Sequence, residues 1–181
     1  MIALILKRKI SAEADLSLSV YSRDKGLLEL RARGAAKATS KLASHLEPLS
    51  LVDIEVLSGK ILGARGEDMY AGIKSDYAKL NYAGQVVALF LSKLRVGEKD
   101  AALFDFMAAF LDYFNQTTDD VEALFYTWSL KLPYVFGWNF DYGPANALVK
   151  KIISSPWSEI YVFPKDKLSS LALKALSLWE Y

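Results

Sequence analysis

The sequence of 181 residues contains no cysteine and only one histidine, His45. Without cysteine the chain has no disulfide framework, no thiolate zinc site and no cysteine nucleophile. One histidine cannot build a multi-histidine metal centre. Neither the Gly-x-x-x-x-Gly-Lys-Ser/Thr motif nor the Gly-x-Gly-x-x-Gly motif is present, so nucleotide binding is not indicated. We therefore expect a protein that is not an enzyme and that uses no metal or cofactor.

The chain also lacks long apolar runs and a large excess of charge of either sign. No stretch approaches the ~20 apolar residues of a membrane span, and the N-terminus does not resemble a signal peptide. The composition is that of a globular protein, with 52% hydrophobic residues and a formal net charge of +1. We expect a cytoplasmic protein, and any nucleic-acid site in it must be a local basic patch.

The first 70 residues have the pattern of short strands. Residues 15–21 and 27–33 alternate between apolar and polar side chains, which is the pattern of a half-buried strand. Residues 2–10, 49–57 and 61–70 are rich in β-forming residues, and glycines in the last stretch indicate a bend. Five short strands predict a small barrel, for which the OB-fold is the leading candidate.

After residue 75 the pattern changes to that of helices. Helices are expected from Ser75 or Asp76 to about Leu94 and over residues 100–114, with apolar residues three and four apart. A third helix should start at Asp119-Asp120 and run to about Phe136.

Pro133 should kink this third helix or end it early, and Gly137 should cap it. The last part predicts a short helix over 145–153, a strand or extended segment over 158–163 and a helix over 167–179. The expected fold class is α+β, with an OB-fold in residues 1–74 and an α-helical domain in residues 75–181.

The strongest local chemical signal is positive charge. Between Arg31 and Leu46 there are four basic residues and no acidic one, separated by small residues. Lysine and arginine bind phosphates and release counterions, without reading the base sequence. A solvated basic loop is the alternative explanation. The predicted DNA-binding residues are Lys7, Arg8, Lys9, Arg23, Lys25, Arg31, Arg33, Lys37 and Lys41.

Base stacking has little support in the predicted barrel. Its only aromatic residues are Tyr21 and Tyr70, and ordinary packing is the favoured explanation for both. We therefore expect DNA binding dominated by electrostatics, which weakens at high salt.

Several short motifs, none of them specific alone, occur in an order that is typical of one protein family. They are Leu6-Lys7-Arg8, Glu13-Ala14-Asp15, Ser22-Arg23-Asp24-Lys25-Gly26, Arg33-Gly34-Ala35, Leu46-Glu47-Pro48, Ser75-Asp76-Tyr77-Ala78-Lys79-Leu80 and Ala102-Leu103-Phe104-Asp105. This ordered set, over roughly residues 2–137, resembles the RecO family of DNA repair and recombination mediators. Many members carry a four-cysteine zinc motif after the third helix and continue further, so the resemblance is to a short, zinc-free form.

The resemblance implies a function. A RecO-like protein is expected to bind single-stranded DNA, to promote strand annealing and to help load recombinase on DNA coated by the single-stranded DNA-binding protein, SSB. RecR and the acidic C-terminal tail of SSB are the implied partners. The helical region would bind this tail, with candidate residues Lys93, Arg95, Tyr126 and Lys131.

Two other functions fit the same sequence. One is a protein-interaction adaptor that bridges SSB and recombination proteins and has little DNA affinity of its own. The other is an RNA-binding OB-fold protein. An adaptor would not need the basic residues between Arg31 and Leu46, and these residues favour DNA mediation.

Overall fold

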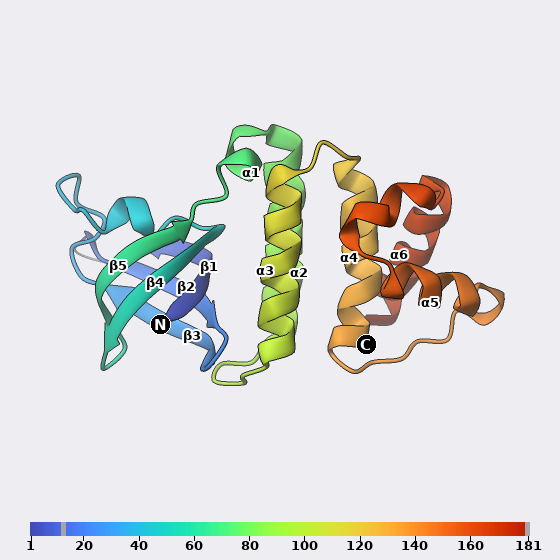
Figure 1. Ribbon diagram of the computed structural model, residues 1–181. Coiled ribbons are helices and arrows are strands. Elements are labelled where there is room, and N and C mark those ends of the chain that lie inside the picture. Colours follow the sequence, from blue (N-terminus) through green and yellow to red (C-terminus); the bar gives the residue numbers. More distant parts are fainter. Residues whose placement is uncertain (12–13, 180–181) are drawn as a thin grey trace. The chain divides into compact units, whose positions relative to one another are not determined.

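The computed structural model describes residues 1–11 and 14–179, so Glu13 of the second motif lies outside the described residues. The N-terminal part forms five strands that close into a barrel in the order β1-β2-β3-β5-β4 (Figure 1). The strands are β1 (Ile2–Ile10), β2 (Leu16–Ser22), β3 (Gly26–Ala32), β4 (Ser50–Leu57) and β5 (Lys60–Asp68). All neighbours pair antiparallel except β3 and β5, which pair parallel. The predicted five-stranded OB-fold barrel is confirmed.

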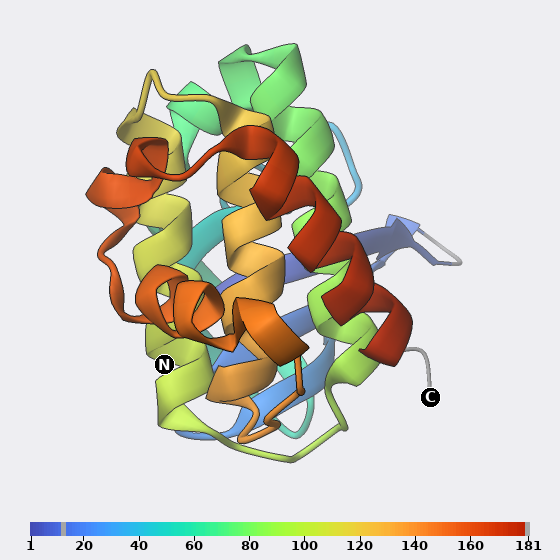
Figure 2. The ribbon, with the colours of Figure 1, turned by 90° about the vertical axis from the view of Figure 1, so that its right-hand side faces the viewer.

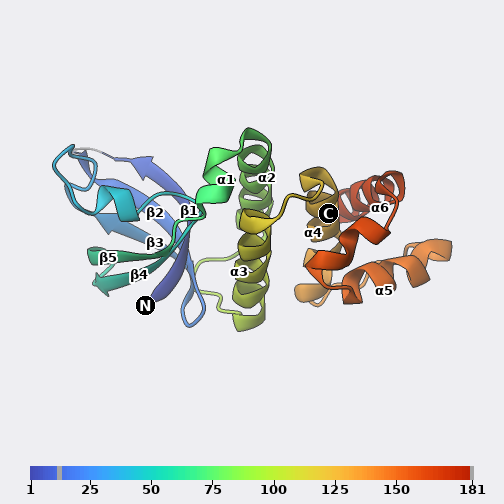
Figure 3. The same ribbon diagram turned by 45° about the horizontal axis from the view of Figure 1, so that its top comes forward.

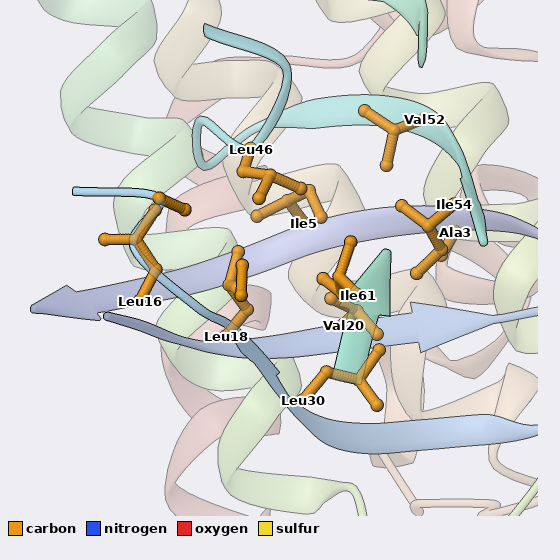
Figure 4. Packing of buried hydrophobic residues seen from close by; sticks show 12 residues of the cluster. Ala3, Ile5, Leu16, Leu18, Val20, Leu30, Leu46, Val52, Ile54 and Ile61 are labelled. Atoms are coloured by element: carbon orange, nitrogen blue, oxygen red, sulfur yellow. The ribbon is translucent and has the colours of Figure 1, made fainter. Parts of the chain in front are cut away.

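The barrel is filled by the apolar side chains that alternate along its strands (Figure 4). Leu18 and Val20 of β2 are fully buried, and Leu30 of β3 is nearly so. This follows from the pleat, which sends successive side chains to opposite faces of a strand. Leu46, also fully buried, joins this core from the connection between β3 and β4. That long connection therefore contributes to the core.

The rest of the chain is helical. The helices are α1 (Ala71–Ser75), α2 (Tyr77–Lys93), α3 (Ala101–Gln116), α4 (Val121–Val135), α5 (Asn146–Ser154) and α6 (Lys165–Trp179). Short 3-10 helices within the described residues include η2 (Ala43–His45), η3 (Gly143–Ala145) and η4 (Trp157–Val162). An α+β class, with a barrel followed by helices, is thus confirmed.

The starts of the predicted helices are explained by side-chain caps. The Asp120 carboxylate accepts hydrogen bonds from the backbone amides of Glu122 and Ala123, which satisfies two unpaired donors at the start of α4. Helix α4 continues through Pro133 to Val135, so this proline lies in the last turn and does not end the helix.

One predicted element is wrong. Residues 158–163 were expected to be a strand or an extended segment, but the chain from Trp157 to Val162 is the 3-10 helix η4. The amide of Glu159 donates to the carbonyl of Pro156, which starts this helix. All strands of the described residues belong to the barrel, so the described part of the helical unit offers this segment no strand with which its backbone could pair.

Contacts group the described chain into two compact units. The barrel unit consists of Met1–Ala71 with Val87–Ala108, and the helical unit consists of Gly72–Val86 with the described chain from Ala109 onward. Helices α2 and α3 contribute residues to both units, so the units do not follow one cut in the chain. The boundary between residues 74 and 75 stays a prediction.

Within the barrel unit, helical residues cover one end of the outer surface of β2. Tyr21 is fully buried there, with its ring 5.3 Å from that of Phe90 and 6.3 Å from that of Phe104. Its hydroxyl donates to the carbonyl of Asp100. Burial beside Asp100 raises the pKa of Tyr21 to about 12. Tyr21 therefore links the barrel to the adjoining ends of α2 and α3.

Within the helical unit, α4 lies against α5 and α6 (Figure 2). Lys165, at the start of α6, forms ion pairs with Asp120 and Glu122 at the start of α4, with nitrogen–oxygen distances of 2.8 and 2.5 Å. Both carboxylates have lowered pKa values. In Glu122 the main cause is the hydrogen bond from Lys165. In Asp120 desolvation raises the pKa, but the hydrogen bonds from Lys165 and from the backbone amides of Ala123 and Glu122 together outweigh it.

At Gly26 a side chain would clash with another segment of the barrel unit. The φ of Gly26 is +68°, and a Cβ placed there would lie 2.0 Å from the carbonyl oxygen of Glu98. Gly59 has a similar φ of +74° but no atom within 4 Å of such a Cβ. We expect Gly59→Ala to cost about 1–2 kcal/mol of unfolding free energy for its backbone conformation alone. Gly26→Ala should cost about 2 kcal/mol more, since it also overpacks the contact.

Urea unfolding of the two glycine variants, followed by circular dichroism, measures this difference. Equal unfolding free energies for Gly26→Ala and Gly59→Ala would contradict the close approach of the segment around Glu98 to the β2–β3 turn.

Candidate nucleic-acid interface

The basic run at the end of β1 is divided by the alternation of the strand. Lys7 and Lys9 are exposed on the outer surface, whereas Arg8 pairs with Leu18, a residue of the barrel core. The guanidinium of Arg8 donates to Glu47 Oε1 at 2.6 Å and to the carbonyl of Ala43 at 3.3 Å. Arg8 therefore holds the β3–β4 connection and does not share the surface of its two neighbours.

Arg23 and Lys25 lie in the turn between β2 and β3, and Arg23 is already paired. Its Nε and Nη2 atoms donate to the two carboxylate oxygens of Asp105, each at 2.9 Å. Arg23 holds the pKa of Asp105 below its usual range through these bonds. At ~3.3 Å per residue the turn is roughly 20 Å along β2 from Ser17, so these residues are not brought together with Lys9.

Three exposed cations lie in one row across the barrel. Lys9 pairs with Ser17, Ser17 pairs with Arg31, and Arg31 pairs with Lys60, which takes the row from β1 through β2 and β3 to β5. Directly paired residues project from the same face of a sheet. Lys9, Arg31 and Lys60 are all exposed, and Ser17 between them is small. We call Lys9, Arg31 and Lys60 the basic row.

The predicted site did not include Lys60. In the sequence it follows Ser58-Gly59 and looks like part of a turn. Only the parallel pairing of β3 with β5, which closes the barrel, places it beside Arg31. The one available signal was the OB-fold expectation itself, because closure of this barrel brings the third and fifth strands together.

The remaining predicted cations, Arg33, Lys37 and Lys41, lie exposed on the β3–β4 connection. This connection is fixed to the turn between β1 and β2. The amide of Gly34 donates to Asp15 Oδ1 at 2.7 Å, and the amide of Ala36 donates to the carbonyl of Ala14 at 2.8 Å. The connection thus lies at the barrel end where β1 finishes and β2 begins (Figure 3).

The packing explanation for the barrel tyrosines is confirmed. Tyr21 and Tyr70 both have 0% exposure. They are the only aromatic residues among the first 70. The barrel strands therefore present cations on their surface and no aromatic ring for base stacking.

The four candidate residues for the SSB tail are divided between the two units. Lys93, which is half-buried, and Arg95, which is exposed, belong to the barrel unit, and Tyr126 and Lys131 belong to the helical unit. The Tyr126 hydroxyl donates to Glu122 Oε1 at 2.8 Å, and this bond raises the pKa of Tyr126.

Lys131 is only 7% exposed, so it is not a surface cation. Its ammonium donates to the carbonyl of Ser155, the C-cap residue of α5, and lies 4.4 Å from the ring centroid of Trp157. Burial lowers the pKa of Lys131 to about 8. The contacts of this side chain are internal to the helical unit.

The described residues lack two further features, a cluster of metal ligands and a membrane-spanning helix. No group of three or more histidine, cysteine, aspartate or glutamate side chains could hold a metal ion there. None of the helices over the described ranges is long and apolar enough to cross a membrane.

Comparisons with known proteins give a consistent result. Residues 1–64 match the family model described as "Recombination protein O N terminal". The chain is 28% identical to a DNA repair protein RecO of Clostridium novyi over 166 residues, which covers 89% of this chain and 64% of that protein. It is 26% identical to the RecO protein of Rubrobacter xylanophilus over 139 residues, or 75% of this chain and 56% of that protein.

A third relative, the RecO protein of Thermosynechococcus vestitus, is 30% identical over 115 residues, which covers 61% of this chain and 41% of that protein. The chain spans less than two thirds of the length of each of these curated relatives.

The buried Lys131 generates a prediction about pH. Its pKa is about 8 in the folded protein, below the ~10.4 of an exposed lysine in the unfolded chain. Between these values the unfolded state binds more protons, so stability rises with pH in this window. Relative to Lys131→Met, the unfolding free energy of the unmodified protein should increase by about 2 kcal/mol between about pH 7.5 and pH 9.5.

Urea unfolding at the two pH values measures this change. Lys150→Met, which removes an exposed lysine of α5, is the matched control and should show no such pH-dependent difference. A difference for Lys131→Met that is constant with pH would contradict a lowered pKa.

Proposed function

The chain belongs to the RecO family of DNA repair proteins, and from this premise we propose that it binds single-stranded DNA through the basic row of its barrel. With this surface it promotes annealing of complementary strands and helps to load recombinase on SSB-coated DNA. The observation that carries the proposal is the row itself, formed by Lys9, Arg31 and Lys60 on three different strands.

The geometry of the basic row suits a phosphate backbone. Neighbouring strands lie ~4.8 Å apart, so the row extends over roughly 14 Å from β1 to β5. Ser17 lies between Lys9 and Arg31, and its small side chain lets a DNA backbone approach the sheet closely. Contacts of this kind neutralise phosphates without reading bases, which suits a mediator that acts on any sequence.

The charges of the basic row are also available. Within the described part of the chain, no ion pair is formed by Lys9, Arg31 or Lys60, unlike Arg8 and Arg23. Binding a phosphate at Arg23 would compete with its bidentate contact to Asp105, whereas binding at the row breaks no such contact. Arg8 and Arg23 are therefore not part of the proposed interface.

Annealing needs no catalytic residue in this proposal. Two complementary strands repel each other through their phosphates, and a cationic surface that binds both lowers this repulsion. Arg33, Lys37 and Lys41 on the β3–β4 connection extend the row at the same end of the barrel, which gives room for a second strand.

We extend the proposal to RecR and to the SSB tail, because the family implies both partners. For the acidic tail, Arg95 is the better candidate cation, since it is exposed and Lys131 is buried. Lys131 is left out of the proposed surface.

The test compares two triple variants that remove the same charge. Lys9→Ala/Arg31→Ala/Lys60→Ala removes the basic row, and Arg23→Ala/Lys25→Ala/Lys99→Ala removes three exposed cations, of which Arg23 and Lys25 lie in the β2–β3 turn. The row variant should slow annealing of complementary oligonucleotides about tenfold or more at low salt. For single-stranded DNA, the slope of log binding constant against log salt concentration should become shallower by about 2, because each of the three lost phosphate contacts contributes ~0.7. The control variant should behave like the unmodified protein.

Each other outcome points to a different function. A folded protein that neither binds nor anneals DNA at low salt would be better explained as a protein-interaction adaptor. Preference for an RNA strand over DNA of the same sequence in competition would favour an RNA-binding protein. Equal losses in both triple variants would mean that the basic row is not the interface.

A further inference from the structure

The segment that follows α4 in the helical unit carries a series of aromatic rings. Phe136, Trp138 and Phe140 occur at alternate positions, with ring centroids 6.3 Å apart for the first pair and 6.1 Å apart for the second. Trp138, the middle ring, is 43% exposed. A large, partly exposed indole flanked by two further rings is the kind of platform on which nucleobases stack.

A hollow of about 520 Å³ lies beside these rings. This volume is within the range of sites for small organic groups. Its lining combines aromatic rings, side-chain amides, one carboxylate and one ammonium group. The lining residues are Tyr134, Asn139, Phe140, Asp141, Asn146 and Lys150.

Hydrogen bonds fix the backbone around the hollow. Asp141 Oδ1 accepts from the amide of Gly143 at 2.8 Å and from the side chain of Asn146 at 2.7 Å. The Asn146 side-chain oxygen in turn accepts from the amide of Tyr142 at 2.8 Å. The bonds from the Gly143 amide and the Asn146 side chain lower the pKa of Asp141. The rings are thus presented by a cross-linked turn.

The local charge favours an anionic backbone despite the carboxylate of Asp141. Lys150 lies in the hollow, and the Lys174 ammonium lies 5.6 Å from the ring of Tyr142, where it also acts on Asp141. Two cations against one acid, whose oxygen is already hydrogen-bonded, leave a net positive surface beside the rings.

We propose that this hollow and the ring of Trp138, which lies beside Phe140 of its lining, form a second contact for single-stranded nucleic acid, in which a base stacks on Trp138. In this proposal the Lys150 ammonium binds a neighbouring phosphate. The side-chain amide of Asn139, in the same hollow, forms hydrogen bonds with the edge of the base. The inference rests on the proposed function, since it concerns the same ligand, and it adds chemistry that the barrel strands do not have.

Another polymer fits this hollow less well. An acidic peptide brings an anion for Lys150 but no flat base for the rings, whereas a nucleotide brings both a phosphate and a base. Among single-stranded ligands, unpaired bases are recognised by aromatic stacking and by hydrogen bonds to their edges.

The experiment separates bases from phosphates. Binding of the full chain to oligo(dT) is compared with binding to an abasic strand of the same length, which has the same phosphates and no bases. The expected result is at least ~5-fold tighter binding of oligo(dT), which corresponds to the lower end of stacking contributions per base. Trp138→Ala should remove this ratio, and Trp138→Phe should keep most of it.

Tyr77→Ala is the matched control, since Tyr77 is a highly exposed aromatic residue on α2 and should leave the ratio unchanged. Equal binding of both strands by the unmodified protein would overturn this inference and leave the proposed function standing. A ratio that persists in Trp138→Ala would also overturn it. If neither strand binds, the proposed function fails and this inference fails with it.

Discussion

The inward packing of alternate apolar residues in the barrel decides where every charge of the N-terminal part lies. Once Leu18, Val20 and Leu30 fill the core, their neighbours Ser17 and Arg31 must face outward. The pairing of β1 with β2 then places Lys9 beside Ser17, and the closure of the barrel adds Lys60. The same register turns Arg8 toward the barrel end, where Glu47 compensates its charge. The surface chemistry of the barrel is thus a consequence of its core.

The outer surface of β2 is divided into two ends with different roles. At one end Tyr21 is buried against Phe90 and Phe104, and Arg23 pairs with Asp105 of α3. Gly26 allows the segment around Glu98 to approach the turn without a side chain between them. The other end, around Ser17, carries the basic row. The helical residues of the barrel unit therefore cover the apolar end of this surface and leave the cationic end to solvent.

The sequence predicted the elements well and the site only in part, for a physical reason. Strand alternation and helix caps such as Asp120 are local, so the five strands and the main helices could be derived from neighbouring residues. The partners of Arg8, Arg23 and Lys60 lie 29 to 82 residues away in the sequence. Neighbouring residues therefore could not predict them, and the partner of Lys60 also depends on closure of the barrel. Lys131 looked like a surface cation because its burial against Ser155 and Trp157 depends on how α4 packs.

The two proposed contacts would respond differently to salt. Binding at the basic row depends on counterion release, so its contribution falls steeply as salt increases. Stacking on Trp138 depends on desolvation and dispersion between flat rings, and these do not involve released ions. A protein with cations on its barrel and rings in its helical unit would keep part of its affinity for unpaired bases at salt concentrations that weaken phosphate contacts. Paired strands have no free bases to stack, so the same salt would release a duplex before a single strand. For an annealing protein this difference would favour release of the product over loss of the substrate.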